Sequence, residues 1–283
     1  MLGKLIKHEF KAVNRLMIPL HLALILITIV GRFYIQFAMG PGRDALNTNI
    51  WYGIISIMLT SFYVIALAAI FTITWVELHI LRPRKNLFTD EGYLMHTLPV
   101  SAASHIWSKL IVAFVWTLMD ALLLVLSVAA MFINQEFFRA FDELWHEMLL
   151  SFPEAFGVSA GLGIPIFLLV MLLDVISGLL IIYMCIAVGH SFNSHKILSS
   201  VGVYVGFQVI GGLLSSTFMA LTGLTSFSGY GSGLSLFITA NGTFNSTAYF
   251  WSTMGFSLVF TLVLSVVSFL VTNYFLTRRL NLE

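Results

Sequence analysis

The chain has 283 residues, of which 59% are hydrophobic and only 10% are charged, and its mean hydropathy is +0.95. Soluble domains carry about 25% charged residues, so this chain is too poor in charge to cover a water-facing surface. Its formal net charge is +1 and its basic residues are dispersed, which argues against a nucleic-acid partner. We therefore expect an all-α integral membrane protein with the lipid bilayer as its surroundings.

The first fifteen residues predict an amphipathic helix that lies on the membrane surface. Charged residues alternate there with apolar ones, a pattern typical of interfacial helices. Six apolar segments follow, each long enough to supply the roughly 20 residues that cross a bilayer. They are residues 16–38, 51–76, 106–132, 160–189, 198–222 and 250–277. An even number of spans places both termini on the same side of the membrane.

The distribution of lysine and arginine predicts the direction of the spans. With cytoplasmic termini, eleven of the fourteen basic residues lie on the cytoplasmic side, as the positive-inside bias requires. The outer side keeps only Arg32, Arg43 and Arg139. We therefore expect both termini in the cytoplasm.

Three segments outside the spans are expected to have their own structure. Residues 79–105 form a polar island between spans two and three, on the cytoplasmic side in this topology. Residues 133–151 combine apolar residues at helical spacing with acids on the other face, which predicts an amphipathic helix along the outer interface. Residues 223–249 are rich in Gly, Ser and Thr, which suits a re-entrant hairpin or a flexible outer loop.

The polar island carries a family resemblance. Leu87-Phe88 is followed by Asp90-Glu91-Gly92-Tyr93-Leu94 and then by Thr97-Leu98-Pro99-Val100-Ser101. Together with the N-terminal helix, the six spans and the glycine-broken region before the last span, this segment resembles the permease subunits of bacterial ABC type-2 exporters. The resemblance implies one permease domain over residues 1–283 in the bacterial cell membrane. It also implies a partner permease, either a second copy or a paralogue, and a separate ABC ATPase that drives transport.

The chain has no nucleotide-binding motif of its own. No G-x-x-x-x-G-K-[ST] sequence occurs, and the nearest stretch, Gly189 to Lys196, lacks the second glycine and the hydroxyl residue after lysine. The eight histidines have no metal-ligand spacing, and the spans carry no recognisable nucleophile–base pair. We therefore expect no enzyme activity, metal or cofactor on this chain, with ATP bound by the partner. The expected cargo is amphipathic or hydrophobic: a peptide, a lipid-like molecule or a drug.

The polar island is the expected docking surface for the ATPase. A docked helix needs charges that fix its register and apolar residues that transmit force. The expected coupling residues are Arg84, Lys85, Leu87, Asp90, Glu91, Tyr93 and Leu94. The alternative is a solvated loop that only connects two spans, although aromatic and aliphatic residues suit such a loop poorly.

Three charged residues fall inside the predicted spans, where charges are costly and often functional. They are Arg32, Asp120 and Asp174. At 1.5 Å per residue, each lies roughly 21 to 24 Å from the cytoplasmic end of its span, so we expect one polar cluster in the outer half. It would form an outer gate or a polar contact for cargo, and a purely structural ion pair is an equal alternative. Near the cytoplasmic ends, Glu77 and Lys109 could pair, although such residues more often extend to the interface.

Two other functions stay open. A stand-alone secondary transporter or channel would use the three buried charges as an ion relay, and would leave the polar island unexplained. A non-transporting membrane partner of an ATPase would share the docking surface and differ only in whether cargo crosses.

Overall fold

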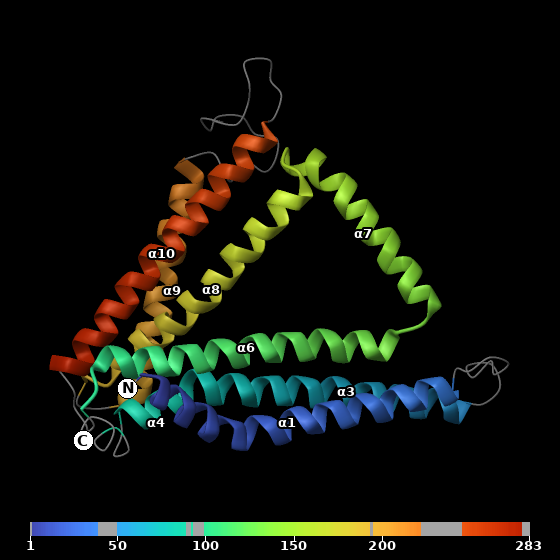
Figure 1. The fold of residues 1–283 in the computed structure, drawn as a ribbon, viewed down its shortest axis with the longest axis horizontal. Coiled ribbons are helices and arrows are strands. Elements are labelled where there is room, and N and C mark those ends of the chain that lie inside the picture. The colour runs from blue at the N-terminus through green and yellow to red at the C-terminus, as the bar shows by residue number, and fades with distance from the viewer. Residues whose placement is uncertain are drawn as a thin grey trace. The chain divides into compact units, whose positions relative to one another are not determined.

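The computed structural model describes residues 2–38, 50–88, 92, 99–192, 195–221 and 245–278, which are almost entirely helical and contain no strand (Figure 1). The helices are α1 (Leu2–Ala38), α3 (Ile50–Val76), α4 (Arg82–Phe88), α6 (Ala102–Phe132), α7 (Gln135–Phe156), α8 (Ala160–Gly189), α9 (Lys196–Leu221) and α10 (Ser246–Arg278). A π-helical segment, η1 (Glu77–Leu81), joins α3 to α4.

Six helical segments of the described chain are long and apolar enough to cross a membrane. They are Leu2–Gln36, Gly53–Phe88, Ala102–Met131, Ala160–Gly189, Lys196–Ala220 and Ser246–Arg278. The predicted all-α class is thus confirmed for the described residues, and six helices have the length and composition of the six predicted spans. The second segment extends well beyond the predicted end at residue 76, because Val76 and Arg82 both keep helical φ and ψ angles on either side of η1.

The chain divides into two compact units. Unit 1 comprises Met1–Asn86 and His96–Ala140, and unit 2 comprises Leu87–Met95 and Phe141–Glu283. Unit 1 therefore contains α1, α3, η1 and α6, whereas unit 2 contains α8, α9 and α10. The division between the units falls within the short helix α4, after Asn86.

Unit 1 is built on a parallel pair of helices, α1 and α6, which α3 accompanies (Figure 1). Side-chain bonds join residue 9 to 109, 21 to 120, 28 to 127 and 32 to 131. A nearly constant offset of 99 to 100 residues is possible only between helices that run in the same direction. Spans one and three must run in the same direction in any alternating topology, so these contacts agree with the span count.

The N-terminal residues continue directly into the first span. Because α1 runs unbroken from Leu2 to Ala38, residues 1–15 do not form the separate interfacial helix that we expected. Val13 and Met17 are buried in a core with Leu78 and Val112. The amphipathic pattern is therefore present, but its apolar face packs against protein rather than lipid.

Unit 2 has α8 as its central helix. Ile181, Met184 and Cys185 of α8 form a buried core against side chains of α9 and α10. Near the end of α8, a Cβ on Gly189 would lie 2.5 Å from the Cα of Ser200, so glycine permits the close approach of α8 and α9. At the other end, Gly157 follows α7 with a φ of +65°, and its carbonyl accepts a 2.9 Å hydrogen bond from Thr247.

The remaining predicted segments are only partly described. A helix occupies the region expected for 133–151, but it extends to Phe156 and none of its residues is buried. Of residues 223–249, only those from 245 onward are described, and they begin α10. The predicted re-entrant element thus lies outside the described residues.

Candidate functional site

Only some of the expected coupling residues belong to the part of the chain that the structure describes. Asp90, Glu91, Tyr93 and Leu94 lie outside it, whereas Arg84, Lys85 and Leu87 belong to α4. Lys85 is exposed and Arg84 is half-buried. Leu87 is completely buried, so its side chain packs within the protein and a partner could not contact it directly in this conformation. Its neighbour Phe88 is also buried and packs on His190, with ring centroids 5.1 Å apart.

A buried ionic network ties the polar island to the helices that flank it. Lys109 Nζ lies 2.5 Å from Glu9 Oε1, and Arg82 Nη1 lies 3.4 Å from Glu9 Oε2. Arg82 Nε also lies 3.6 Å from Glu77 Oε1. The side chains of Lys109 and Glu9 are only 4% and 6% exposed. Since buried charges require close partners, these contacts hold α1, α4 and α6 together, and Lys109 does not extend to the interface.

Glu9 is the residue that the sequence reasoning missed. The sequence pattern indicates a surface charge on an interfacial helix, whereas Glu9 is buried and forms ion pairs with Lys109 and Arg82. The available signal was spacing. Residues 9, 13 and 17 follow each other at intervals of four and therefore share one helix face, and Val13 and Met17 are apolar. An acid on an apolar face predicts a buried partner.

Asp120 forms a buried pair with His21 inside the spans. His21 Nε2 lies 2.5 Å from Asp120 Oδ1, and His21 Nδ1 lies 2.6 Å from the carbonyl oxygen of Met17. A carbonyl only accepts hydrogen bonds, so Nδ1 carries a proton. The bond between Nε2 and Oδ1 then contains one further proton, on the imidazole or on the carboxyl group. In either arrangement the pair has no net charge, which suits its position in the spans.

A small cavity lies beside this pair. Its lining includes His21, Asp120, Phe71, Thr74 and Leu124. Its volume is about 10 Å³, close to the space that one water molecule needs.

Arg32 lies apart from Asp120. Its guanidinium group donates hydrogen bonds to the carbonyl oxygens of Met131, at 3.4 Å, and Ile133. These carbonyls belong to the C-terminal end of α6, where a cation is favourable because of the helix dipole. Arg32 is separated from His21 by eleven residues, or about 16 Å along α1. The expected pairing of Arg32 with Asp120 is therefore replaced by separate partners at separate levels.

Asp174 belongs to unit 2. Its Oδ1 accepts a 2.5 Å hydrogen bond from the hydroxyl of Thr261, so the carboxylate joins α8 to α10. Each of Arg32, Asp120 and Asp174 thus has a partner within its own unit, and Arg32 and Asp120 lie at different levels of unit 1.

Three hydroxyl groups form a contact among α1, α3 and α6, between the levels of His21 and Arg32. Ser127 of α6 lies 2.7 Å from the hydroxyl of Thr28 on α1 and 2.6 Å from that of Tyr63 on α3. Hydrogen bonds between membrane helices contribute about 0.6 kcal/mol each on average. They mainly fix which faces of the three helices meet.

No protein-family model, curated protein or solved structure matches the chain. Its function is therefore inferred from its own residues and their contacts. Within the described ranges, no group of three or more His, Cys, Asp or Glu side chains could hold a metal ion. The chemistry that these ranges show consists of buried ion pairs and a shared proton.

Proposed function

We propose that the chain is the membrane-spanning subunit of an ATP-driven ABC exporter. It would act with a separate ATPase and with a second permease, either a copy of itself or a paralogue. The six apolar helices support a multi-pass membrane protein. The resemblance of Leu87–Ser101 to the coupling segment of such permeases supports the ATPase partner, and the lack of a phosphate-binding loop requires one. The location would be a bacterial cell membrane, with both termini in the cytoplasm.

The attachment of the polar island is the observation that carries this proposal. Arg82 lies near the start of the island and Lys109 follows its end, and both contact the carboxylate of Glu9 on α1. Arg82 also contacts the carboxylate of Glu77 in η1, which belongs to the second span. A push on the island would therefore reach α1, α6 and the second span together. A loop that merely connects two spans has no need for this support.

The same segment is also attached to unit 2 through the end of α4. Phe88 is buried there against His190. Closure of the ATPases would push on the island and switch the spans between inward-facing and outward-facing states. ATP can drive this switch only if the ATPase binds the two states with different free energies. The cargo would be amphipathic or hydrophobic: a peptide, a lipid-like molecule or a drug.

Co-purification from the native host tests the docking role. The chain offers two Asp-Glu pairs, Asp90-Glu91 in the polar island and Asp142-Glu143 in the exposed helix α7. We expect an ATPase to accompany the unaltered protein and the Asp142→Ala/Glu143→Ala variant, but not the Asp90→Ala/Glu91→Ala variant. Equal recovery with both variants, or no ATPase with the unaltered protein, would contradict the proposal. ATP-dependent movement of an amphipathic dye in reconstituted vesicles separates an exporter from a non-transporting partner of an ATPase.

The His21–Asp120 pair favours a second candidate, a proton-coupled secondary transporter. Ionisable pairs inside membrane spans often form proton relays, and this pair shares one proton beside a water-sized cavity. This candidate requires dye transport driven by a pH gradient without ATP and abolished by Asp120→Asn. Transport that requires ATP and ignores the gradient would exclude it.

A further inference from the structure

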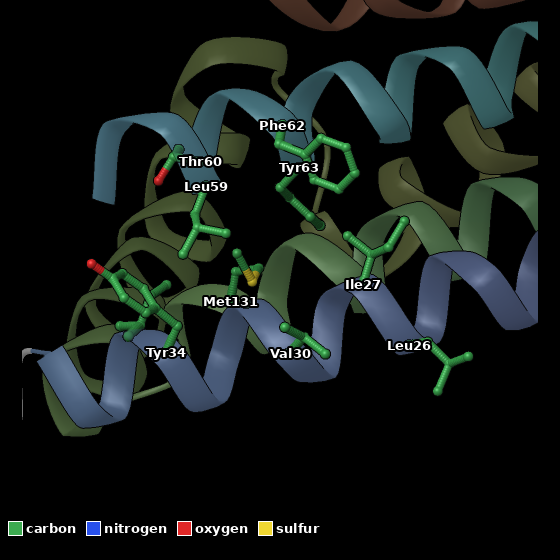
Figure 2. Close-up of a pocket in the computed structure, with 11 residues that line it drawn as sticks. Leu26, Ile27, Val30, Tyr34, Leu59, Thr60, Phe62, Tyr63 and Met131 are labelled. Atoms are coloured by element: carbon green, nitrogen blue, oxygen red, sulfur yellow. The ribbon is translucent and has the colours of Figure 1, made fainter. Parts of the chain in front are cut away.

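An apolar groove lies in unit 1 between the later half of α1 and the first half of α3. It has a volume of about 190 Å³, and its lining includes Val30 and Tyr34 of α1, Thr60 and Tyr63 of α3, and Met131 of α6. Figure 2 shows residues of α1 and α3 on either side of this space, with Met131 between the two helices. Val30 on its rim is 61% exposed, so the groove opens toward the surroundings of the spans.

Contacts at the base keep the groove in shape. A Cβ on Gly31 would lie 2.8 Å from the methyl carbon of Met131, so these two residues are in tight contact. The Tyr63 hydroxyl lies 2.6 Å from Ser127, which also bonds to Thr28. Because the base is fixed by hydrogen bonds and close packing, the groove is a preformed feature.

Arg32 carries a positive charge on the α6 side of the groove, since its guanidinium bonds to the carbonyl of Met131, whose side chain lines the groove. Its two partners, the carbonyl oxygens of Met131 and Ile133, are neutral. Among the residues that the structure describes, no carboxylate forms an ion pair with it. Two carbonyls also leave part of the guanidinium's five-donor set for another acceptor. A guanidinium at the edge of a membrane span that bonds only neutral carbonyls among the described residues is suited to an anionic ligand.

The position of Arg32 identifies the source of that ligand. The span containing Arg32 ends at Gln36, which is four residues or about 6 Å further along the helix. In the proposed topology this is the outer end of the first span, where the hydrocarbon core would meet the headgroups. A phosphate there would meet a guanidinium that can bind it through two parallel hydrogen bonds.

We propose that this site binds one anionic phospholipid. Its phosphate would contact Arg32 and one of its acyl chains would fill the groove. An acyl chain has the apolar chemistry that the lining requires, and the bilayer supplies it at this depth. In the proposed topology the lipid belongs to the outer leaflet. The site depends only on the chain spanning a membrane, and it stands whether or not an ATPase docks on the polar island.

Photo-labelling of the full-length protein in lipid nanodiscs tests the site. The probes are phosphatidylglycerol and phosphatidylcholine that carry the same diazirine-labelled acyl chain, and the labelled peptides are mapped by mass spectrometry. Thr60→Trp fills the groove, and Val64→Trp is its control one turn along α3, since Val64 is exposed and does not line the groove. Arg32→Gln removes the charge, and Arg139→Gln of the exposed helix α7 is the matched control.

The two halves of the site give separate results. We expect peptides of the groove to be labelled about tenfold more by phosphatidylglycerol than by phosphatidylcholine, as one charge-assisted contact would give. Arg32→Gln should equalise the two lipids while acyl labelling persists, and Arg32→Lys should recover part of the preference. Thr60→Trp should remove labelling by both lipids. Both control variants should behave like the unaltered protein.

Three outcomes would overturn the proposal. One is equal labelling of the groove by the two lipids in the unaltered protein. Another is labelling of Thr60→Trp equal to that of Val64→Trp. The third is cross-linking between two copies of the chain at groove peptides in place of lipid adducts, which would show that a second copy occupies the groove.

Discussion

Replacing Lys109 by methionine measures how strongly the ionic network stabilises unit 1. Methionine retains much of the volume of the lysine stem and removes its charge, so packing changes little. Breaking a buried ion pair by removing one partner costs about 3 to 5 kcal/mol. Arg82 still lies 3.4 Å from Glu9 after the change, so we expect the lower end, about 3 kcal/mol. Water cannot replace the lost partner easily, because the Glu9 side chain is only 6% exposed.

The assay is unfolding of the purified protein by added denaturing detergent, followed by circular dichroism. Lys11→Met is the control, since Lys11 is exposed on the same helix, and it should change the free energy of unfolding by less than about 0.5 kcal/mol. Adding Glu9→Gln to Lys109→Met should recover part of the loss, because the buried acid is then neutral. The reasoning is refuted if Lys109→Met unfolds like Lys11→Met, or if the costs of the two changes simply add.

Three further predictions use the same unfolding assay. Asp120→Asn should lower the free energy of unfolding less than Asp120→Leu, because an amide can donate a hydrogen bond to His21 Nε2. Leucine leaves this buried nitrogen unpaired, at a cost of about 1 to 3 kcal/mol. Equal losses of stability would contradict the shared proton. Gly189→Ala should destabilise the protein, because the added methyl group would collide with α9. Gly202→Ala has open space around it and should stabilise its helix by up to about 1 kcal/mol. A change in the free energy of unfolding with the same sign for both variants would contradict the packing. Gly157→Ala should cost about 1 to 2 kcal/mol because its φ is +65°; an unchanged midpoint would mean that this backbone conformation is not required.

Hydropathy was sufficient to predict the class and most of the spans. The fourth span was predicted over 160–189, which matches α8, and the sixth over 250–277, which lies within Ser246–Arg278. The environment of the first fifteen residues could not be predicted in this way. An apolar helix face has the same residue pattern whether lipid or protein covers it, and here Val13 and Met17 pack on Leu78.

Predicting the partners of the buried charges requires the register between neighbouring helices. The boundaries of the spans do not provide that register. The predicted starts of spans one and three, residues 16 and 106, imply an offset of 90 residues, whereas the contacts give 99 to 100. An error of about nine residues displaces the facing residue by about 14 Å. Asp120 was therefore identified as a buried charge, but Arg32 was aligned with it in place of His21. The presence of a histidine inside an apolar span was the signal for the true partner.

The register of α1 and α6 also limits how the protein can move. Their polar contacts extend from residue 9 to residue 32 of α1, which is about 34 Å and comparable to the thickness of a bilayer core. Sliding one helix past the other by a single turn would separate a cation from a carboxylate, an imidazole from its acid and a guanidinium from its carbonyls at the same time. A gradual slip along this seam has no low-energy intermediate. The two helices must therefore move as one rigid pair, and any conformational change of unit 1 has to tilt or translate that pair as a whole.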